Sequence, residues 1–199
     1  MDRREALRQV ALLTGAAISM PFAAAILQGC ESEAGSAVGE GLKYLTQKQF
    51  DVFNEVAERI MPKTDTPGAK DAGVTNFIDK MLGEYYPAED SKKYAAAIDA
   101  FDKACEAANG KSFTEMTDDD RDAYLKTVEN QAYKDVEAGK DTKEIFWFTA
   151  KQGTLMAFFL SEAGSTKVLQ HVAIPGPYQG CVPLSEAGRG VTWTSDNGI

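Results

Sequence analysis

The sequence predicts an all-α protein, a compact bundle of five or six helices with an N-terminal export signal before it and a long irregular C-terminal arm after it. Apolar residues recur at three- and four-residue spacing through most of the middle of the chain, which is typical of amphipathic helices. We find no convincing alternating strand and no internal repeat. The composition changes near both ends, and these changes divide the chain into residues 1–30 (export signal), 31–44 (flexible tether), 45–170 (helical domain) and 171–199 (extended arm).

Length and charge narrow the classes of function. With 199 residues, the chain is long enough for one compact domain after a leader is removed. A formal net charge of −9 repels phosphate, so we expect no binding to nucleic acid. Charge would not favour docking on anionic lipid either. There is a single histidine, which excludes a multi-histidine metal site.

Residues 1–30 fit an export signal. Arg3 and Arg4 stand in a basic start, and an apolar stretch from Ala11 to Leu27 follows. The pair resembles the twin-arginine signal, which the twin-arginine translocase reads and which carries folded proteins across the membrane. An N-terminal membrane anchor is the alternative, although the stretch is at the lower limit for a bilayer span and Pro21 would interrupt a helix there. We therefore expect a periplasmic protein.

The end of the leader, "ILQGC", resembles a lipoprotein box. Leu27 lies three residues before the cysteine, Gly29 lies just before it, and Cys30 would be the acceptor, while Gln28 departs from the usual small or apolar residue. Acylation of Cys30 would attach the protein to the membrane surface. Cleavage near "FAAA" with an unmodified Cys30, or no cleavage, are the alternatives. The small polar residues of "ESEAGSAVGEG" then predict a flexible tether.

The first helices are predicted from their end signals. Thr46 and Gln49 form a capping-box pattern before an apolar stripe, and Pro62 ends that helix. The next stretch, "PKTDTPGAKDAG", is dense in turn residues and predicts a loop. A second helix follows over "VTNFIDKMLGEYY", and Pro87 stops it.

The remaining helices follow the same logic. Ser91 to Asn109 carries an apolar face and ends at Gly110. Thr117 precedes three aspartates, which is typical of a helix N-terminus. The segment "KEIFWFTAKQGTLMAFFLSEAG" is apolar nearly all round and predicts the central helix of the bundle, with its end near Gly164. A further short helix is expected over "STKVLQ".

The last 29 residues, "HVAIPGPYQGCVPLSEAGRGVTWTSDNGI", have no hydrophobic period. They are rich in proline and glycine, yet they include Tyr178 and Trp193. A solvated disordered tail usually lacks such residues. We therefore expect an extended arm that lies against either a partner or the chain's own bundle.

Candidate catalytic residues are few. No haem-attachment, dinucleotide or phosphate-loop motif is present, and the "TDDD" run lacks the pattern of an EF-hand. His171 would act as a base beside an acidic partner, but it has no evident nucleophile, so a structural role is expected. If lipid occupies Cys30, two cysteines remain, Cys105 and Cys181. They could form a disulfide, or Cys105 could be a simple buried thiol.

Several stretches together resemble a known family. They are "RREALRQVALLTG", "LTQKQFDVFNEVAERIMPKTDTPGAKDAGVTNFID", "GTLMAFFLSEAG" and "IPGPYQGC". The chain resembles the gluconate 2-dehydrogenase subunit 3 family, the small subunits of membrane-associated flavin sugar dehydrogenases. One departure is His171, four residues before Pro175, where an aromatic residue is expected.

The resemblance implies a non-catalytic helper with no cofactor or metal of its own. In the family, a large subunit of the glucose-methanol-choline oxidoreductase type carries FAD, and a cytochrome c with haem c often accepts the electrons. The small subunit supplies the twin-arginine address for export. Our candidates for the surface that holds the large subunit are Pro62, Pro67 and Gly68 in the loop, since proline-fixed loops lose less entropy on docking, and Pro175, Tyr178 and Trp193 in the arm, where large aromatic side chains are suitable anchors.

Two other functions stay open at this stage. One is a free-standing periplasmic helical lipoprotein that binds a small ligand in its bundle. The other is an enzyme that uses His171 and a nearby carboxylate.

Overall fold

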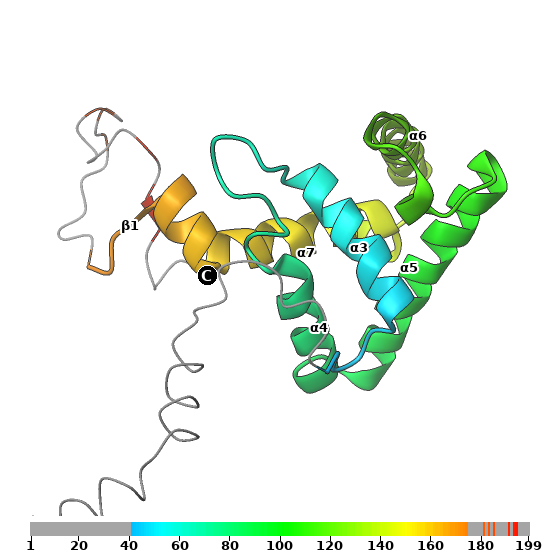
Figure 1. The fold of residues 1–199 in the computed structure, drawn as a ribbon, viewed down its shortest axis with the longest axis horizontal. Coiled ribbons are helices and arrows are strands. Elements are labelled where there is room, and N and C mark those ends of the chain that lie inside the picture. The colour runs from blue at the N-terminus through cyan, green and yellow to red at the C-terminus, as the bar shows by residue number, and fades with distance from the viewer. Residues whose placement is uncertain are drawn as a thin grey trace, which may run out of the picture. The chain divides into compact units, whose positions relative to one another are not determined.

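A computed structural model describes residues 41–174 and the separate positions 181, 183, 185, 191, 193 and 194. All of them belong to one compact unit, Ser36–Ile199. The described part is mostly helical, and the predicted all-α class is confirmed (Figure 1). Its α-helices are α3 (Gln47–Ile60), α4 (Val74–Glu84), α5 (Ala88–Asn109), α6 (Asp118–Glu137) and α7 (Phe146–Leu160). Shorter elements are the 3₁₀ turns η1 (Phe113–Glu115) and η2 (Thr142–Glu144), the π-helix η3 (Gly164–Val168), and two short strands, β1 (Gln170–His171) and β2 (Trp193–Thr194).

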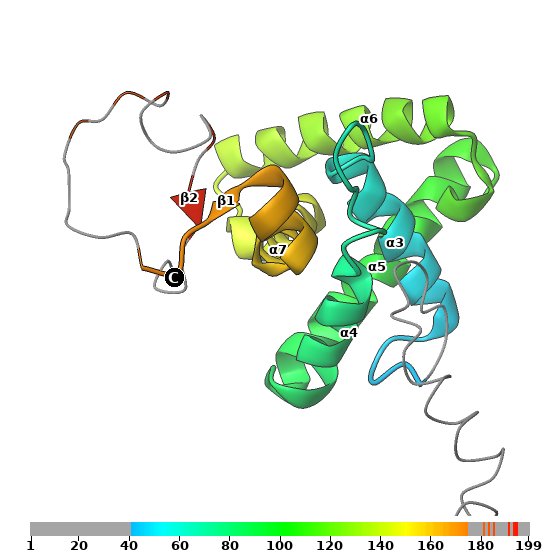
Figure 2. The same cartoon turned by 60° about the vertical axis from the view of Figure 1, so that its left-hand side comes forward.

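Helix α7 is the centre of the bundle, as its apolar composition predicts. It contacts α3, α4, α5 and α6 (Figures 1 and 2). Its buried residues include Ala150, Thr154 and Ala157, whose small side chains let neighbouring helices approach closely. Helix α3 packs beside it and buries Phe53, Val56 and Ala57 completely.

A second part of the core is a group of aromatic rings where α5, η1, α6 and α7 meet. Phe101 of α5 lies 5.1 Å from Phe113, 5.6 Å from Tyr124 and 4.8 Å from Phe146, measured between ring centroids. Tilted and edge-on arrangements such as these are favourable for aromatic pairs. This group fixes α6 against the rest of the bundle.

Two helix boundaries differ from the prediction because serine side chains act differently from what the sequence suggests. Helix α5 begins at Ala88, three residues before Ser91, whose buried hydroxyl donates to the carbonyl of Leu82 at 2.7 Å, near the end of α4. Helix α7 ends at Leu160 rather than near Gly164. Ser161 leaves the helix with extended backbone angles, and its Oγ donates to Phe158 O at 2.6 Å and accepts from Gly164 N at 3.0 Å. Such a side-chain bond offers the backbone an alternative to helix.

The chain before α3 is part of the fold rather than the end of a tether. Asp79 of α4 is buried, and its carboxylate accepts hydrogen bonds from the backbone N–H groups of Lys43 at 2.6 Å, Tyr44 at 3.0 Å and Leu45 at 2.7 Å. Leu45 is buried, and Tyr44 packs against the core. The boundary that the sequence places after residue 44 therefore lies earlier in the structure.

The C-terminal arm contains a short parallel pairing that the sequence does not predict. Gln170 pairs with Trp193, and His171 pairs with Thr194. Residues 193 and 194 therefore lie beside the start of the arm, just after η3. Arg3, Arg4, Cys30, Pro175 and Tyr178 lie outside the described residues. None of the helices within the described ranges has the length and apolar character needed to cross a membrane.

Candidate functional site

The loop of residues 61–73, between α3 and α4, has a defined structure although it contains no helix or strand. It extends beyond the end of α3 before it returns to α4 (Figure 1). Ala69 is fully buried at its base. The N–H of Ala69 donates to Met61 O at 2.8 Å, and Val74 N donates to Ala69 O at 3.1 Å. These bonds join the two ends of the loop to each other and to the start of α4.

Glu58, in the last turn of α3, holds the loop from within. Its Oε1 accepts from Lys63 N at 3.0 Å, and its Oε2 accepts from Lys70 N at 2.9 Å. Gly68 lies directly on this carboxylate, because a Cβ at that position would be 2.5 Å from Glu58 Oε1 and 2.6 Å from Lys63 N. Only glycine fits there without displacing the backbone or the carboxylate.

A charged network connects the same loop to α6. Glu55 of α3 pairs with Lys70 at 2.7 Å through Oε1 and with Arg121 at 2.8 Å through Oε2. Arg121 is mostly buried, and it also donates from Nε to Phe113 O at 2.9 Å and from Nη2 to Thr114 O at 2.6 Å. Because several partners fix the guanidinium, the pair with Glu55 has less side-chain freedom to lose than an ordinary surface ion pair. The loop is therefore attached directly to α3 and, through Glu55 and Arg121, to α6 and η1.

The outer face of the loop is its accessible side. Pro62, Lys63 and Asp65 are exposed, whereas Pro67 is half-buried and Gly68 is buried beneath them. A hydrogen bond from Lys63 holds the pKa of Asp71 below its usual value, so this pair stays charged near neutral pH. A loop fixed in this way loses little conformational entropy when it binds.

The other predicted site residues are distributed over the rest of the structure. Trp193 lies in β2, and the exposed His171 lies opposite that strand's Thr194. Cys105 and Cys181 are separate thiols, the first buried and the second exposed, so the bridge considered from the sequence is not formed in this structure. Cys105 Sγ lies 3.2 Å from Met116 Sδ, and burial raises the pKa of its thiol.

The described residues contain no cluster of three or more His, Cys, Asp or Glu side chains placed to hold a metal ion. The loop presents fixed backbone, the exposed Pro62 and the charged pair of Lys63 and Asp71.

The carboxylates of Asp79 and Glu58, which organise these regions, are not predicted from the sequence. Asp79 is one residue from Ile78 on the buried face of α4, so its position on the apolar stripe was a detectable signal. Glu58 has no such signal, since nothing in the sequence distinguishes it from a solvated charge at a helix end.

Fold and loop together define a small helical protein with one well-anchored loop. Comparison with known families makes the class specific: the model of the gluconate 2-dehydrogenase subunit 3 family matches residues 47–176. The chain belongs to this family, which consists of accessory subunits of a dehydrogenase complex. No curated protein and no solved structure matched the chain in the comparisons.

Proposed function

We propose that this chain is the non-catalytic small subunit of a periplasmic, FAD-dependent sugar or polyol dehydrogenase. In this role it provides the twin-arginine export signal for the complex and stabilises the large flavin-bearing subunit. The flavin belongs to the large subunit, and a cytochrome c with haem c is the expected electron acceptor.

The observation that carries the proposal is the family match over 47–176. It covers the five α-helices, the loop of residues 61–73 and the first part of the arm. The fixed loop supports a binding role, because docking a preorganised surface costs less entropy than ordering a flexible one. The exposed Pro62 and the anchored backbone around Gly68 belong to that surface.

The export role rests on Arg3 and Arg4. A translocase that carries folded proteins would move a preassembled pair of subunits, so one address would serve both. Substituting both arginines with lysine keeps the charge but removes the guanidinium groups. We expect the flavoprotein activity to disappear from the periplasmic fraction in this variant and to remain in the cytoplasm. Arg8→Lys is the matched control, and equal loss of export in both variants would contradict the assignment.

Partner binding is tested by co-expression with a large FAD-dependent oxidoreductase subunit from the same organism. A tag on this chain should recover the flavoprotein, and truncation after His171 should abolish the recovery. Gly68→Ala should weaken it, because the added methyl displaces the Glu58 carboxylate and loosens the loop. Gly153→Ala, which adds the same methyl inside α7, is the control. Full recovery with both the truncated chain and Gly68→Ala would refute the proposed surfaces.

A further inference from the structure

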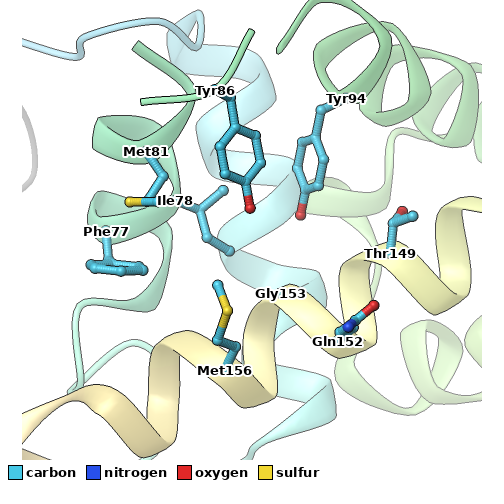
Figure 3. A pocket seen from close by; sticks show the side chains of 9 residues that line it. All are labelled: Phe77, Ile78, Met81, Tyr86, Tyr94, Thr149, Gln152, Gly153 and Met156. Carbon is cyan, nitrogen blue, oxygen red and sulfur yellow. The ribbon is translucent and has the colours of Figure 1, made fainter. Parts of the chain in front are cut away.

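A pocket of about 240 Å³ lies between α4, α5 and α7. Figure 3 shows that its walls come from all three helices and from the turn between α4 and α5. Most of its lining is apolar, and none of the lining side chains carries a charge. The lining residues are Phe77, Ile78, Met81, Tyr86, Tyr94, Thr149, Gln152, Gly153 and Met156.

Tyr94 places an unpaired polar atom in this pocket. Its hydroxyl oxygen is buried and has no hydrogen-bond partner among the described residues. In Figure 3 the hydroxyl points into the pocket, beside that of Tyr86. A buried polar group without a partner is costly, and most such groups in native proteins are satisfied by protein, water or a ligand. Burial also raises the pKa of the Tyr94 hydroxyl, so it stays protonated and acts as a donor.

Gly153 lies directly against this hydroxyl. A Cβ at residue 153 would lie 3.3 Å from Tyr94 Oη and 3.5 Å from Ile78 Cδ1. Glycine in the middle of a helix is unfavourable relative to alanine. Its presence in the central helix, facing the buried and unpaired hydroxyl of Tyr94, fits a position where room is needed.

The lining defines the chemistry of a ligand. An anion or a cation would enter without a counter-charge, which is unfavourable in an apolar site, so the ligand is neutral. The flexible side chains of Met81 and Met156 can adapt to the shape of a bound ring. The rings of Phe77 and Tyr86 offer aromatic surface for it to pack against. An apolar cavity of about 150 Å³ is enough to bind benzene, so this pocket has room for one substituted ring.

We propose that this pocket binds a neutral aromatic molecule of about one ring that carries a carbonyl oxygen, with the Tyr94 hydroxyl donating to that oxygen. A carbonyl is an acceptor without a donor, so it satisfies Tyr94 and adds no unpaired N–H or O–H to the apolar walls. Amide side chains of a protein partner would bring such donors with them. This site is independent of the proposed role in export and assembly.

The probe is acetophenone, titrated into the purified chain and followed by calorimetry or ligand-observed NMR. Ethylbenzene has nearly the same shape but no carbonyl, and benzoate has a similar shape with a charge. We expect saturable binding of acetophenone, about tenfold weaker binding of ethylbenzene, which is typical of one lost hydrogen bond, and no binding of benzoate.

Two variants and a control identify the site. In Tyr94→Phe, the two affinities should become about equal, because neither ligand then has a hydroxyl to accept from. A loss of overall stability would weaken both ligands alike and leave the ratio of their affinities unchanged. Gly153→Ala should weaken both probes, because its methyl occupies the space in front of the hydroxyl. Tyr133→Phe, at an exposed tyrosine on α6, should leave both affinities unchanged.

The assignment is wrong if acetophenone shows no saturable binding, or if its preference over ethylbenzene survives in Tyr94→Phe. It is also wrong if the assembled dehydrogenase complex excludes acetophenone completely, since the pocket would then be a protein contact. Saturable, Tyr94-dependent binding in both the free chain and the complex supports it.

Discussion

Asp79→Asn tests how the chain entering the bundle is fixed to α4. The carboxylate accepts three backbone hydrogen bonds, two on Oδ1 and one on Oδ2, and the residue is 4% exposed. In the variant, the amide oxygen can replace Oδ1, but the amide NH₂ then faces the N–H of Lys43. One bond to a charged group is lost, at about 1.5–3 kcal/mol, and the other two lose their charge assistance.

The expected loss of unfolding free energy is therefore about 2–4 kcal/mol. For a protein of this size, about 1 kcal/mol corresponds to about 2–4 °C, so the melting temperature should fall by about 4–16 °C. Urea denaturation and thermal unfolding by circular dichroism measure both quantities. Asp51→Asn is the control, because Asp51 is exposed on α3 and accepts a hydrogen bond from the side chain of Gln47. Its effect should stay within about 0.5 kcal/mol.

Hydrogen exchange gives the location of the effect. The amides of residues 43–45 should exchange faster in Asp79→Asn, whereas those in the middle of α7 should change only as global stability changes. A free energy of unfolding within about 0.5 kcal/mol of the wild type, with unchanged exchange at residues 43–45, would refute the reasoning.

Three more predictions follow from the described structure. Gly164→Ala should destabilise the protein by about 1–3 kcal/mol in urea, because a Cβ there overlaps the carbonyl of Phe158; a loss no larger than that of Gly153→Ala would contradict this. Burial alone would raise the pKa of Asp102, but its bonds from Lys48 and its neighbours hold the pKa below the usual value. The stability that this carboxylate contributes is therefore present above about pH 4 and is lost as the pH falls through its folded pKa. Acid unfolding of Asp102→Asn should then depend less steeply on pH than that of the wild type. Equal slopes for the two proteins would argue against this. In thiol titration of the purified chain, Cys181 should react quickly and Cys105 only after unfolding. If neither of these two thiols reacts even in the unfolded chain, Cys105 and Cys181 are joined in a disulfide and this prediction is wrong.

Much of the helical architecture was predictable because local signals and tertiary packing agree. The capping box of Thr46 and Gln49 is present, with both of its hydrogen bonds, at the start of α3. Gly110 has the left-handed conformation at the end of α5, and the Thr117 side chain caps α6. In each case a short stretch of sequence contains all of the groups that interact.

The differences arise where distant residues interact. Ser91 resembles a helix start, but its hydroxyl is used by the carbonyl of Leu82 on the preceding helix. Asp79 bonds to backbone about 35 positions earlier, and no local pattern indicates such a pairing. The pairing of Gln170 with Trp193 joins two short segments, neither of which has an alternating pattern.

The candidate site was predictable in part for the same reason. The turn residues around Pro62, Pro67 and Gly68 indicated the loop, since each has its own conformational preference. The rigidity of the loop could not be predicted, because it depends on Glu58 and Arg121, which come from two different helices. The pocket around Tyr94 requires three helices to meet, so it becomes visible only in the folded chain.

The most direct test of the central claim is the flavin content and sugar-oxidising activity of this chain, purified alone and purified together with the large subunit. The account predicts that the chain alone is colourless and inactive, and that the co-purified pair contains one flavin per large subunit and oxidises the sugar with an electron acceptor. A yellow, active preparation of this chain by itself would contradict the account.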